Sequence, residues 1–222
     1  MRSCLMTKLM LAAALCFAGA MLGAASKKSY IKDVKVSVSS SYAPNPRVQN
    51  ISTSDKSSLK WVLIEFEVNT EKFDGKNGVY LDDVELVVDA ALLNGEKKGV
   101  EQVVLFTGAI EYYSIELDGK KHKLLALIPG SIFARYANEK TDPAKANWNI
   151  KATLNFRGSA IAVKYYSNVN GTSEKDLKVW FNKYKNVKTV SVREVADSVF
   201  ARRETPWGMI DHDQYEFEKK AK

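Results

Sequence analysis

The sequence predicts a mainly β protein: an immunoglobulin-like antiparallel β-sandwich with two short helices near its C-terminus. Apolar and polar residues alternate with a period of two in several segments between residues 30 and 166, as in half-buried strands. Turn-forming pairs such as Asn-Gly, Asp-Gly and Pro-Gly separate these segments. Beyond residue 170 the apolar spacing changes to the i, i+3, i+4 pattern of a helix. About seven or eight short strands with frequent turns are typical of a sandwich, although the cysteine and tryptophan pattern of a true antibody domain is missing.

The chain opens with a secretory signal peptide, which we assign to residues 1–25. Arg2 and Lys8 give it a positive start, and an almost wholly apolar run follows, closed by small residues. The run is shorter than the roughly 20 residues of a spanning helix, so we expect no permanent membrane span after cleavage. Both cysteines, Cys4 and Cys16, lie in this leader, so the mature chain depends on an apolar core for its stability. We therefore expect an exported protein, periplasmic or at the cell surface.

The strands of the sandwich are expected between residues 26 and 170. They are residues 30–42, 59–70, 79–93, 100–117 (as one strand or two), 123–128, 149–157 and 160–166. Hairpin turns are predicted at Asn94-Gly95, Asp118-Gly119 and Gly158-Ser159. The pattern of residues 131–137 is ambiguous.

One connection is unusually long. Residues 43–58 are rich in Pro, Asn and Ser, and Pro44 and Pro46 block regular strand pairing. Long connections within a compact domain are often functional, so this one is a candidate binding loop.

Residues 171–222 are expected to form a helical section packed on the sandwich. Leu177, Trp180, Phe181 and Tyr184 have helical spacing, and Ser173 with Asp176 is placed as a capping box. A second helix is predicted from Val192 to Phe200, with Ser191 and Glu194 as its capping box and Pro206 after its end. The tail beyond it is too apolar for a free tail, so it is expected to dock on the domain or on a partner.

The residues offer no catalytic, metal or cofactor site. His122 lies among lysines in a predicted hairpin and is expected to be a solvated turn residue. Asp211, His212 and Asp213 supply too few ligands for a metal without a second cluster. Asp83 and Glu85 share a strand face that Asp82 does not, and a solvated strand face explains these acids better than a glycosidase pair. We therefore expect a protein that is not an enzyme.

Charge gives no strong signal of a nucleic-acid partner. The chain has 33 Lys and Arg against 26 Asp and Glu. The densest basic cluster, Lys183, Lys185 and Lys188, lies beside aromatic residues, a combination that can bind nucleic acid or an acidic glycan. The helical spacing instead favours aromatics in the core and lysines in solvent, so no nucleic acid is expected.

The chain resembles a family of secreted, pilus-like immunoglobulin-fold proteins of Verrucomicrobia, encoded near type IV pilus assembly genes. The segments that carry the resemblance are residues 31–36, residues 61–66 and the closing Arg203-Glu204-Thr205-Pro206-Trp207. It implies an immunoglobulin-like fold, a periplasmic or surface location and a role in pilus function or host contact, with no catalytic residue to carry over. A true type IV pilin keeps a long apolar N-terminal helix, whereas polar sequence follows the apolar run here, so the resemblance implies a pilus-associated protein rather than a pilus subunit.

We therefore expect a non-enzymatic exported protein that contacts envelope or pilus assembly proteins. A periplasmic glycan- or solute-binding module is the alternative, and a secreted hydrolase is a third. The candidate partner-binding residues are Trp207, Trp180, Phe181, Pro44 and Pro46, although Trp207 serving only to anchor the tail is the favoured reading. The sequence leaves the oligomeric state open.

Overall fold

The computed structural model describes residues 29–43, 59–73, 78–137, 142–209, 215–216 and 218–219. The chain divides into two compact units, Met1–Tyr30 and Ile31–Lys222, and the account below concerns the second. The predicted signal peptide, Pro44, Pro46 and His212 lie outside the described residues.

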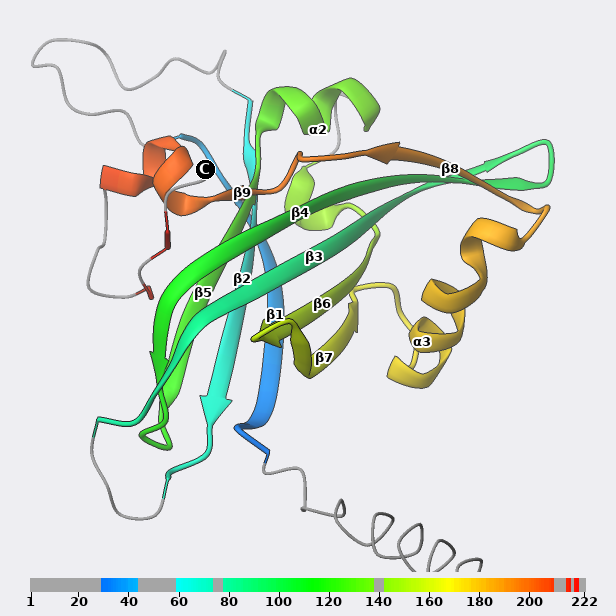
Figure 1. Ribbon diagram of the computed structural model, residues 1–222. Helices are drawn as coiled ribbons and strands as arrows, with labels where there is room; N and C mark the ends of the chain where they lie inside the picture. The colour runs from blue at the N-terminus through cyan, green and yellow to red at the C-terminus, as the bar shows by residue number, and fades with distance from the viewer. Residues whose placement is uncertain are drawn as a thin grey trace, which may run out of the picture. The chain divides into compact units, whose positions relative to one another are not determined.

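The described part of this unit is built mainly from strands, in two sheets (Figure 1). One sheet has the order β1-β2-β5-β9 and the other β7-β6-β3-β4-β8. The elements are β1 (Ile31–Ser41), β2 (Trp61–Thr70), β3 (Tyr80–Lys97), β4 (Val100–Glu116), β5 (Lys121–Ile128), α2 (Gly130–Tyr136), η1 (Pro143–Lys145), β6 (Trp148–Phe156), β7 (Ser159–Ser167), α3 (Glu174–Lys183), η2 (Tyr184–Asn186), β8 (Val190–Val195), β9 (Phe200–Ala201), η3 (Arg202–Glu204) and η4 (Pro206–Met209). The predicted β-sandwich is confirmed.

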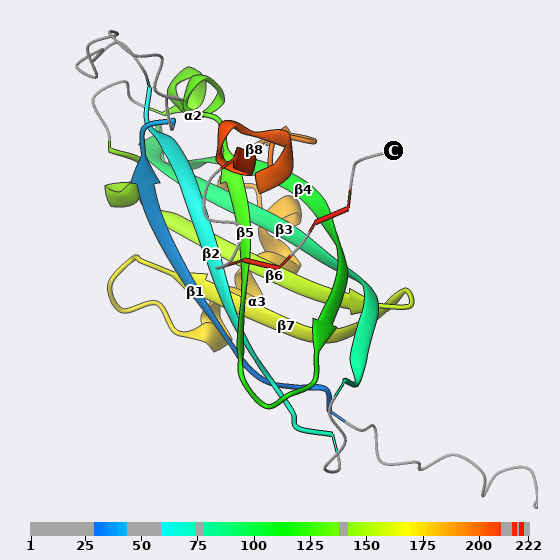
Figure 2. The same cartoon turned by 90° about the vertical axis from the view of Figure 1, so that its left-hand side faces the viewer.

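The core lies between the two layers, which Figure 2 shows one in front of the other. Alternation along β2 places its even-numbered residues inward, and all of those between Val62 and Val68 are fully buried. The facing layer contributes the inward residues of β3, such as Val84, Leu86 and Val88, which are also buried. Period-two alternation therefore predicted both the strands and their inner faces.

The β3–β4 hairpin differs from the prediction in where it turns. Asn94 and Gly95 lie inside β3 at a register shift, and the chain reverses at Lys98 and Gly99. Both turn residues have positive φ, 55° and 75°, which is what a two-residue turn matching the strand twist requires. The Asn94 side-chain amide donates to the Tyr136 carbonyl at 2.8 Å, a tertiary contact that sequence spacing does not reveal.

The helix α3 confirms the first predicted helix, including its cap. The Ser173 hydroxyl accepts from the Asp176 backbone N–H, and the Asp176 carboxylate accepts from the Ser173 backbone N–H. The apolar face of α3 and η2 covers a second cluster on the outer face of the five-stranded sheet. Its buried members are Ala91, Val103, Leu105 and Tyr184, with Leu93, Trp180, Phe181, Val190 and Val192 packed against them.

The second predicted helix, from Val192 to Phe200, is wrong. Residues 190–195 form β8, which pairs in parallel with residues 101–106 of β4. Val190 and Val192 pack into the cluster under α3, so an available sheet edge and an apolar surface override helical spacing. Asp197, with a φ of 49°, then redirects the chain, and Phe200 and Ala201 pair with β5 as β9. The second helix that the structure does contain is α2, in the stretch whose pattern was ambiguous.

The two long sides of the sandwich differ. On the closed side, where the edges of β4 and β5 face each other, the chain after β8 crosses from one sheet to the other. Ser198 and Val199 donate backbone hydrogen bonds to the Thr107 carbonyl on β4 before β9 pairs with β5. On the open side, β1 and β7 lie side by side as the edge strands of their sheets, and no described residue pairs with their outer edges.

Candidate interaction surface

An aromatic surface lies at one end of the sandwich, where β1 ends and β2 begins. We call it the aromatic end and define it as Tyr42, Leu59, Trp61 and Trp207. Trp61 and Trp207 meet edge to face, with ring centroids 5.1 Å apart, and both are half-buried. Tyr42 and Leu59 are each 49% exposed. Large apolar side chains that stay accessible beside a packed tryptophan pair are typical of contact surfaces.

A polar clamp fixes the backbone at this end. Asp142, at the start of η1, accepts hydrogen bonds from the Ser40 hydroxyl at 2.6 Å and from the Lys60 ammonium at 2.6 Å. These contacts, Lys60 first, lower the pKa of the Asp142 carboxyl from 3.8 to about 2. The Lys60 ammonium also lies 5.7 Å from the centre of the Tyr42 ring. The clamp therefore ties Ser40, near the end of β1, to Lys60, the residue that precedes β2.

Of the five predicted partner-binding residues, the structure describes one, Trp207, at this end. Trp207 is on η4 and touches Trp61, which the sequence did not single out. Pro44 and Pro46 lie outside the described residues, which stop at Ala43 and resume at Leu59. The signal that could have found Trp61 is its position immediately after the long connection.

Trp180 and Phe181 lie elsewhere, on the face of α3 that packs against the five-stranded sheet. The Trp180 ring stacks on Tyr184 at 4.7 Å with an interplanar angle of 9°, and the Phe181 ring lies 5.9 Å from Tyr165. Both side chains are half-buried and packed on the cluster under α3. Their contacts are therefore those of core residues, and the structure does not bring them to the aromatic end.

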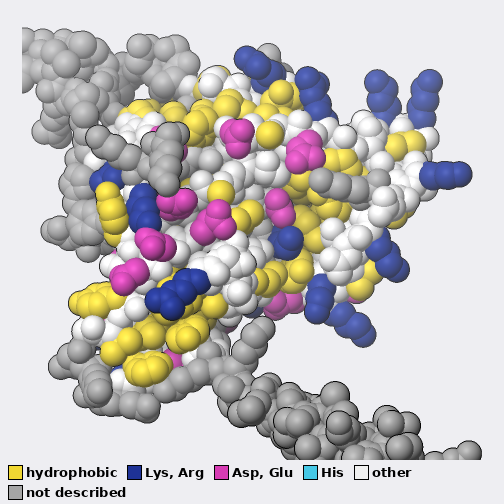
Figure 3. Space-filling view, in the orientation of Figure 1, with side chains coloured by type: hydrophobic (Ala, Val, Ile, Leu, Met, Phe, Trp, Pro, Cys, Tyr) yellow, Lys and Arg dark blue, Asp and Glu magenta, His cyan; other side chains and the backbone are white. Residues whose placement is uncertain are grey.

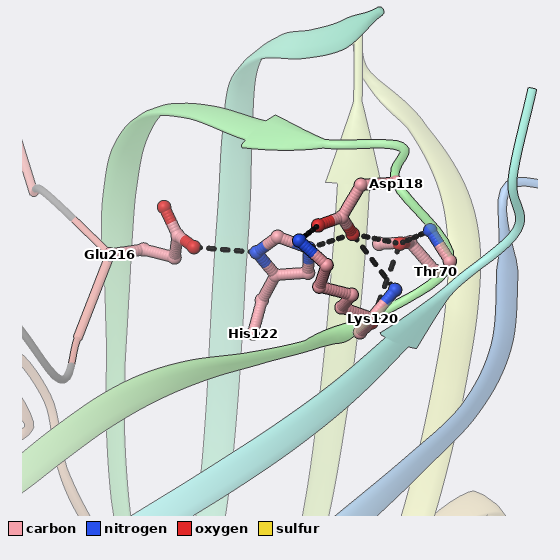
Figure 4. A network of polar contacts seen from close by, with 6 residues as sticks. Thr70, Asp118, Lys120, His122 and Glu216 are labelled. Carbon is pink, nitrogen blue, oxygen red and sulfur yellow. Dashed lines mark hydrogen bonds and ion pairs between the residues drawn. The ribbon is translucent and has the colours of Figure 1, made fainter. Parts of the chain in front are cut away.

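His122 is not the solvated turn residue that its lysine neighbours suggested. It lies within β5 with 8% exposure, and carboxylates engage both ring nitrogens (Figure 4). Glu216 lies 2.6 Å from Nδ1, and Asp118 lies 3.0 Å from Nε2. The lysines on either side point outward, whereas alternation turns His122 towards the C-terminal residues that cover β5. The sequence could not show this, because Glu216 is 94 residues away.

The two carboxylates decide the charge of His122. Burial alone would lower its pKa, but the hydrogen bonds that the ring donates to the Glu216 and Asp118 carboxylates outweigh burial and raise the pKa above 6.5. Asp118, itself bonded by the Lys120 backbone N–H and by His122, has a pKa lowered from 3.8 to about 2 despite partial burial. Carboxylates therefore engage both ring nitrogens of His122, and this network joins chain segments that are far apart in the sequence.

Asp83 and Glu85, the acids that the sequence placed on one face of a strand, also interact with other side chains. Asp83, which has a φ of 58°, forms an ion pair with Lys219, and Glu85 accepts a hydrogen bond from the Asn155 amide at 2.7 Å. Among the described residues, no three His, Cys, Asp or Glu side chains are grouped as metal ligands.

A narrow apolar crevice lies between the layers on the open side. It has no room for a water-sized molecule, and its lining contains neither Trp nor Tyr. It is lined by Val34, Phe66, Leu86, Ala152, Leu154, Ala162 and Lys164.

Charges are segregated over the surface. Figure 3 shows Lys and Arg side chains gathered at the right-hand end of the view, where Figure 1 places α3 and the β3–β4 turn. Asp and Glu side chains lie over the middle of the same face. The exposed lysines of the basic end include Lys97, Lys98, Lys178, Lys183 and Lys188.

Comparisons with known proteins agree on a family and a fold. A protein-family model named after a pilus-associated protein matches residues 22–222. A crystal structure of a protein from Akkermansia muciniphila is similar with a TM-score of 0.57 and 17% identity, covering 85% of this chain and 96% of that one. None of the curated proteins matches the sequence. Within the described ranges, no helix is both long and apolar enough to cross a membrane.

Proposed function

This chain belongs to the family of that pilus-associated protein, and we propose that it is a non-enzymatic exported protein associated with a type IV pilus or another cell-surface assembly. It acts through protein–protein contacts, and the aromatic end is the surface that makes them. The predicted signal peptide supports export to the periplasm or the cell surface.

The observation that carries the proposal is the build of the aromatic end. Tyr42 and Leu59 stay half exposed although the backbone beneath them is clamped by Asp142 and the Trp61–Trp207 pair. Rigid aromatic side chains lose little conformational entropy when they are covered by a partner, which makes them effective contact residues.

The alternatives find less support. Among the described residues, His122, Asp83 and Glu85 are each engaged by other side chains, which gives a hydrolase no specific support. The crevice between the layers is narrow and lined mainly by apolar side chains, so it gives a solute-binding module no specific support either.

The test is capture of envelope proteins on the immobilised mature chain, residues 26–222. We expect a pilus or surface-assembly component to bind the wild type and to be lost with Tyr42→Ala and with Trp207→Ala. Tyr80→Ala is the matched control, because Tyr80 is 50% exposed but lies on β3, near the Thr70 end of β2. Circular dichroism verifies that each variant is folded.

Recovery of no assembly component by the folded wild type would overturn the association. Equal loss with Tyr42→Ala and Tyr80→Ala would place the contact surface elsewhere. Retention of an envelope glycan without any protein would favour the glycan-binding alternative.

A further inference from the structure

The solvent side of α3 is basic, whereas its other side carries the aromatic residues described above. Residues three and four apart lie on one face of a helix, so positions 175, 178, 179, 182 and 183 share a face. The side chains at these positions are all exposed, and they are Lys175, Lys178, Val179, Asn182 and Lys183. The opposite face packs on the cluster of the five-stranded sheet. The helix is therefore amphipathic, with lysines on its outer face.

The turn after α3 extends this basic surface. Val187 and Lys188 are exposed there. Figure 3 shows the gathering of Lys and Arg side chains at the right-hand end of the view, where Figure 1 places α3. We call this surface the lysine face and define it as Lys175, Lys178, Val179, Lys183, Val187 and Lys188.

The positive charge of the lysine face is not balanced by nearby acids. Residues 174–190 contain five lysines and only two acids, Glu174 and Asp176. Glu174 forms an ion pair with Lys164 on β7, and Asp176 belongs to the helix cap. Within the described ranges, no ion pair engages three of the lysines, which are Lys178, Lys183 and Lys188. Their charges are therefore available to a partner.

The neighbouring β3–β4 hairpin does not change this excess. The Glu101 backbone N–H donates to the Thr189 carbonyl at 2.8 Å, which places the end of the hairpin beside the turn after α3. The hairpin end carries two lysines and two acids, Lys97, Lys98, Glu96 and Glu101. The excess of positive charge thus belongs to α3 and the turn that follows it.

The exposed valines decide which anionic partner fits this face. Val179 is 47% exposed beside Lys178, and Val187 is 38% exposed beside Lys188. A bilayer surface has anionic headgroups above an apolar interior, so it can bind lysines and bury apolar side chains at the same time. Acidic polysaccharides and nucleic acids offer no such interior. The rings that could stack on a base or a sugar, such as Trp180, are instead packed on the sheet.

We propose that the lysine face binds the surface of an anionic lipid bilayer, as a peripheral contact with phosphate-bearing headgroups. The lysines bind the phosphates, and Val179 and Val187 enter the headgroup layer. Figure 1 shows α3 at the right and the orange stretch that contains η4 at the left. A chain held on a membrane by α3 therefore leaves Trp207 accessible. This surface and this partner differ from those of the aromatic end, so neither proposal depends on the other.

Co-sedimentation of the mature chain, residues 26–222, with lipid vesicles tests the proposal. Vesicles of phosphatidylcholine with an equal amount of phosphatidylglycerol are anionic, and vesicles of phosphatidylcholine alone are not. We expect binding to the anionic vesicles only. Raising the ionic strength from about 0.1 M to about 1 M should weaken it, because the screening length falls from about 10 Å to about 3 Å. Equal binding to both kinds of vesicle, or no binding to the anionic ones, would overturn the proposal.

A pair of double variants locates the binding surface. Lys178→Gln combined with Lys183→Gln is expected to weaken binding about 25-fold, because each lysine near an anionic surface contributes about fivefold. Lys72→Gln combined with Lys145→Gln is the matched control, since it removes the same charge at exposed positions outside α3. This control should bind as the wild type does. Equal weakening of the two double variants would mean that net charge alone acts, which would overturn the lysine face as the site.

A third comparison separates a lipid from a glycan. Val179→Ser is expected to weaken vesicle binding about threefold to tenfold, because less apolar surface is buried in the bilayer. Leu59→Ser is the control, since Leu59 is 49% exposed at the aromatic end, and it should leave vesicle binding unchanged. Binding to polygalacturonate, an acidic polysaccharide, as tightly as to the anionic vesicles would favour a glycan partner and overturn the proposal. Circular dichroism verifies that each variant is folded.

Discussion

The closed and open sides of this sandwich differ in what lies against their edge strands. An uncovered strand edge has unpaired backbone groups that can bind other strands. On the closed side, the chain itself covers the edges of β4 and β5 with β8, β9 and the backbone of Glu216 and Lys219. On the open side, side chains protect the edges of β1 and β7 instead.

The protecting side chains of the open side are recognisable. Lys164 on β7 lines the apolar crevice opposite Ala152, and its ammonium reaches Glu174 on α3 at 3.1 Å. β1 begins with a register shift near Lys32 and carries Asp33 and Lys35. A lysine on the edge strand and an irregular, charged strand start both discourage edge-to-edge pairing. Covering an edge creates specific buried contacts, whereas guarding an edge only prevents unwanted ones.

This difference predicts that substitutions on the closed side cost more stability than those on the open side. The largest effect is expected for Glu218→Ala, which removes a buried carboxylate 3.9 Å from the Arg202 Nε and takes the acceptor from two backbone donors. We expect a loss of about 3–5 kcal/mol in the free energy of unfolding, measured by urea titration. Glu96→Ala, at an exposed position, serves as the control and should change it by less than about 0.5 kcal/mol. Equal effects of the two substitutions would show that the Glu218 pair contributes nothing specific.

The second largest loss of stability is expected where the chain crosses from one sheet to the other, at Ser198 and Val199. A Cβ at Gly108 would lie 2.4 Å from the Val199 carbonyl oxygen and 2.8 Å from the Val199 Cβ. Gly108→Val is therefore expected to displace the crossing and to cost about 1–3 kcal/mol, read from the same titration. Ala109→Val, the exposed neighbour on the same strand, is the control. If Gly108→Val were as stable as the wild type, β4 and the crossing chain would not be in close contact.

The His122 contact makes the closed side sensitive to pH. His122 has a raised pKa in the folded protein, so its stabilising contribution is complete below about pH 6.5, the pKa of a free histidine, and is lost as the pH rises through the folded pKa. We expect His122→Gln to cost about 1.5–3 kcal/mol at pH 6 and progressively less at higher pH. Unfolding titrations at several pH values measure this convergence, and two parallel stability profiles would contradict it.

The smallest effect on stability is expected on the open side. Lys164→Ile removes a partly exposed ion pair and adds apolar surface to the crevice, so stability should change by less than about 1 kcal/mol. Its consequence should instead be self-association through β7, seen as a larger mass in light scattering. Lys151→Ile is the control, because Lys151 lies on a central strand. Monomeric behaviour of both variants at the same concentration would show that Lys164 does not guard the edge.

The success of the sequence prediction varied along the chain for physical reasons. The strand β2 and the capped helix α3 were predicted because burial on one face and a local cap both leave a periodic signal. The stretch that forms β8 has apolar residues compatible with two periods, and only the edge of β4 decided between them. At the candidate site, Trp207 was named from its place in an apolar tail, with anchoring of that tail as the favoured reading. Trp61 and Asp142 were not, because their roles depend on neighbours that are distant in the sequence.

The sequence alone determined local properties of this protein: the strands from β1 to β7, the faces that β2 and β3 bury, and the predicted leader with both cysteines. These follow from periodicity and composition, which a chain carries in any conformation. Only the tertiary structure decided which strand edges are covered, that His122 is buried between Asp118 and Glu216, and that Glu218 forms an ion pair with Arg202. Each of these contacts joins residues far apart in the chain, and their free energies exist only once the two sheets have been brought together.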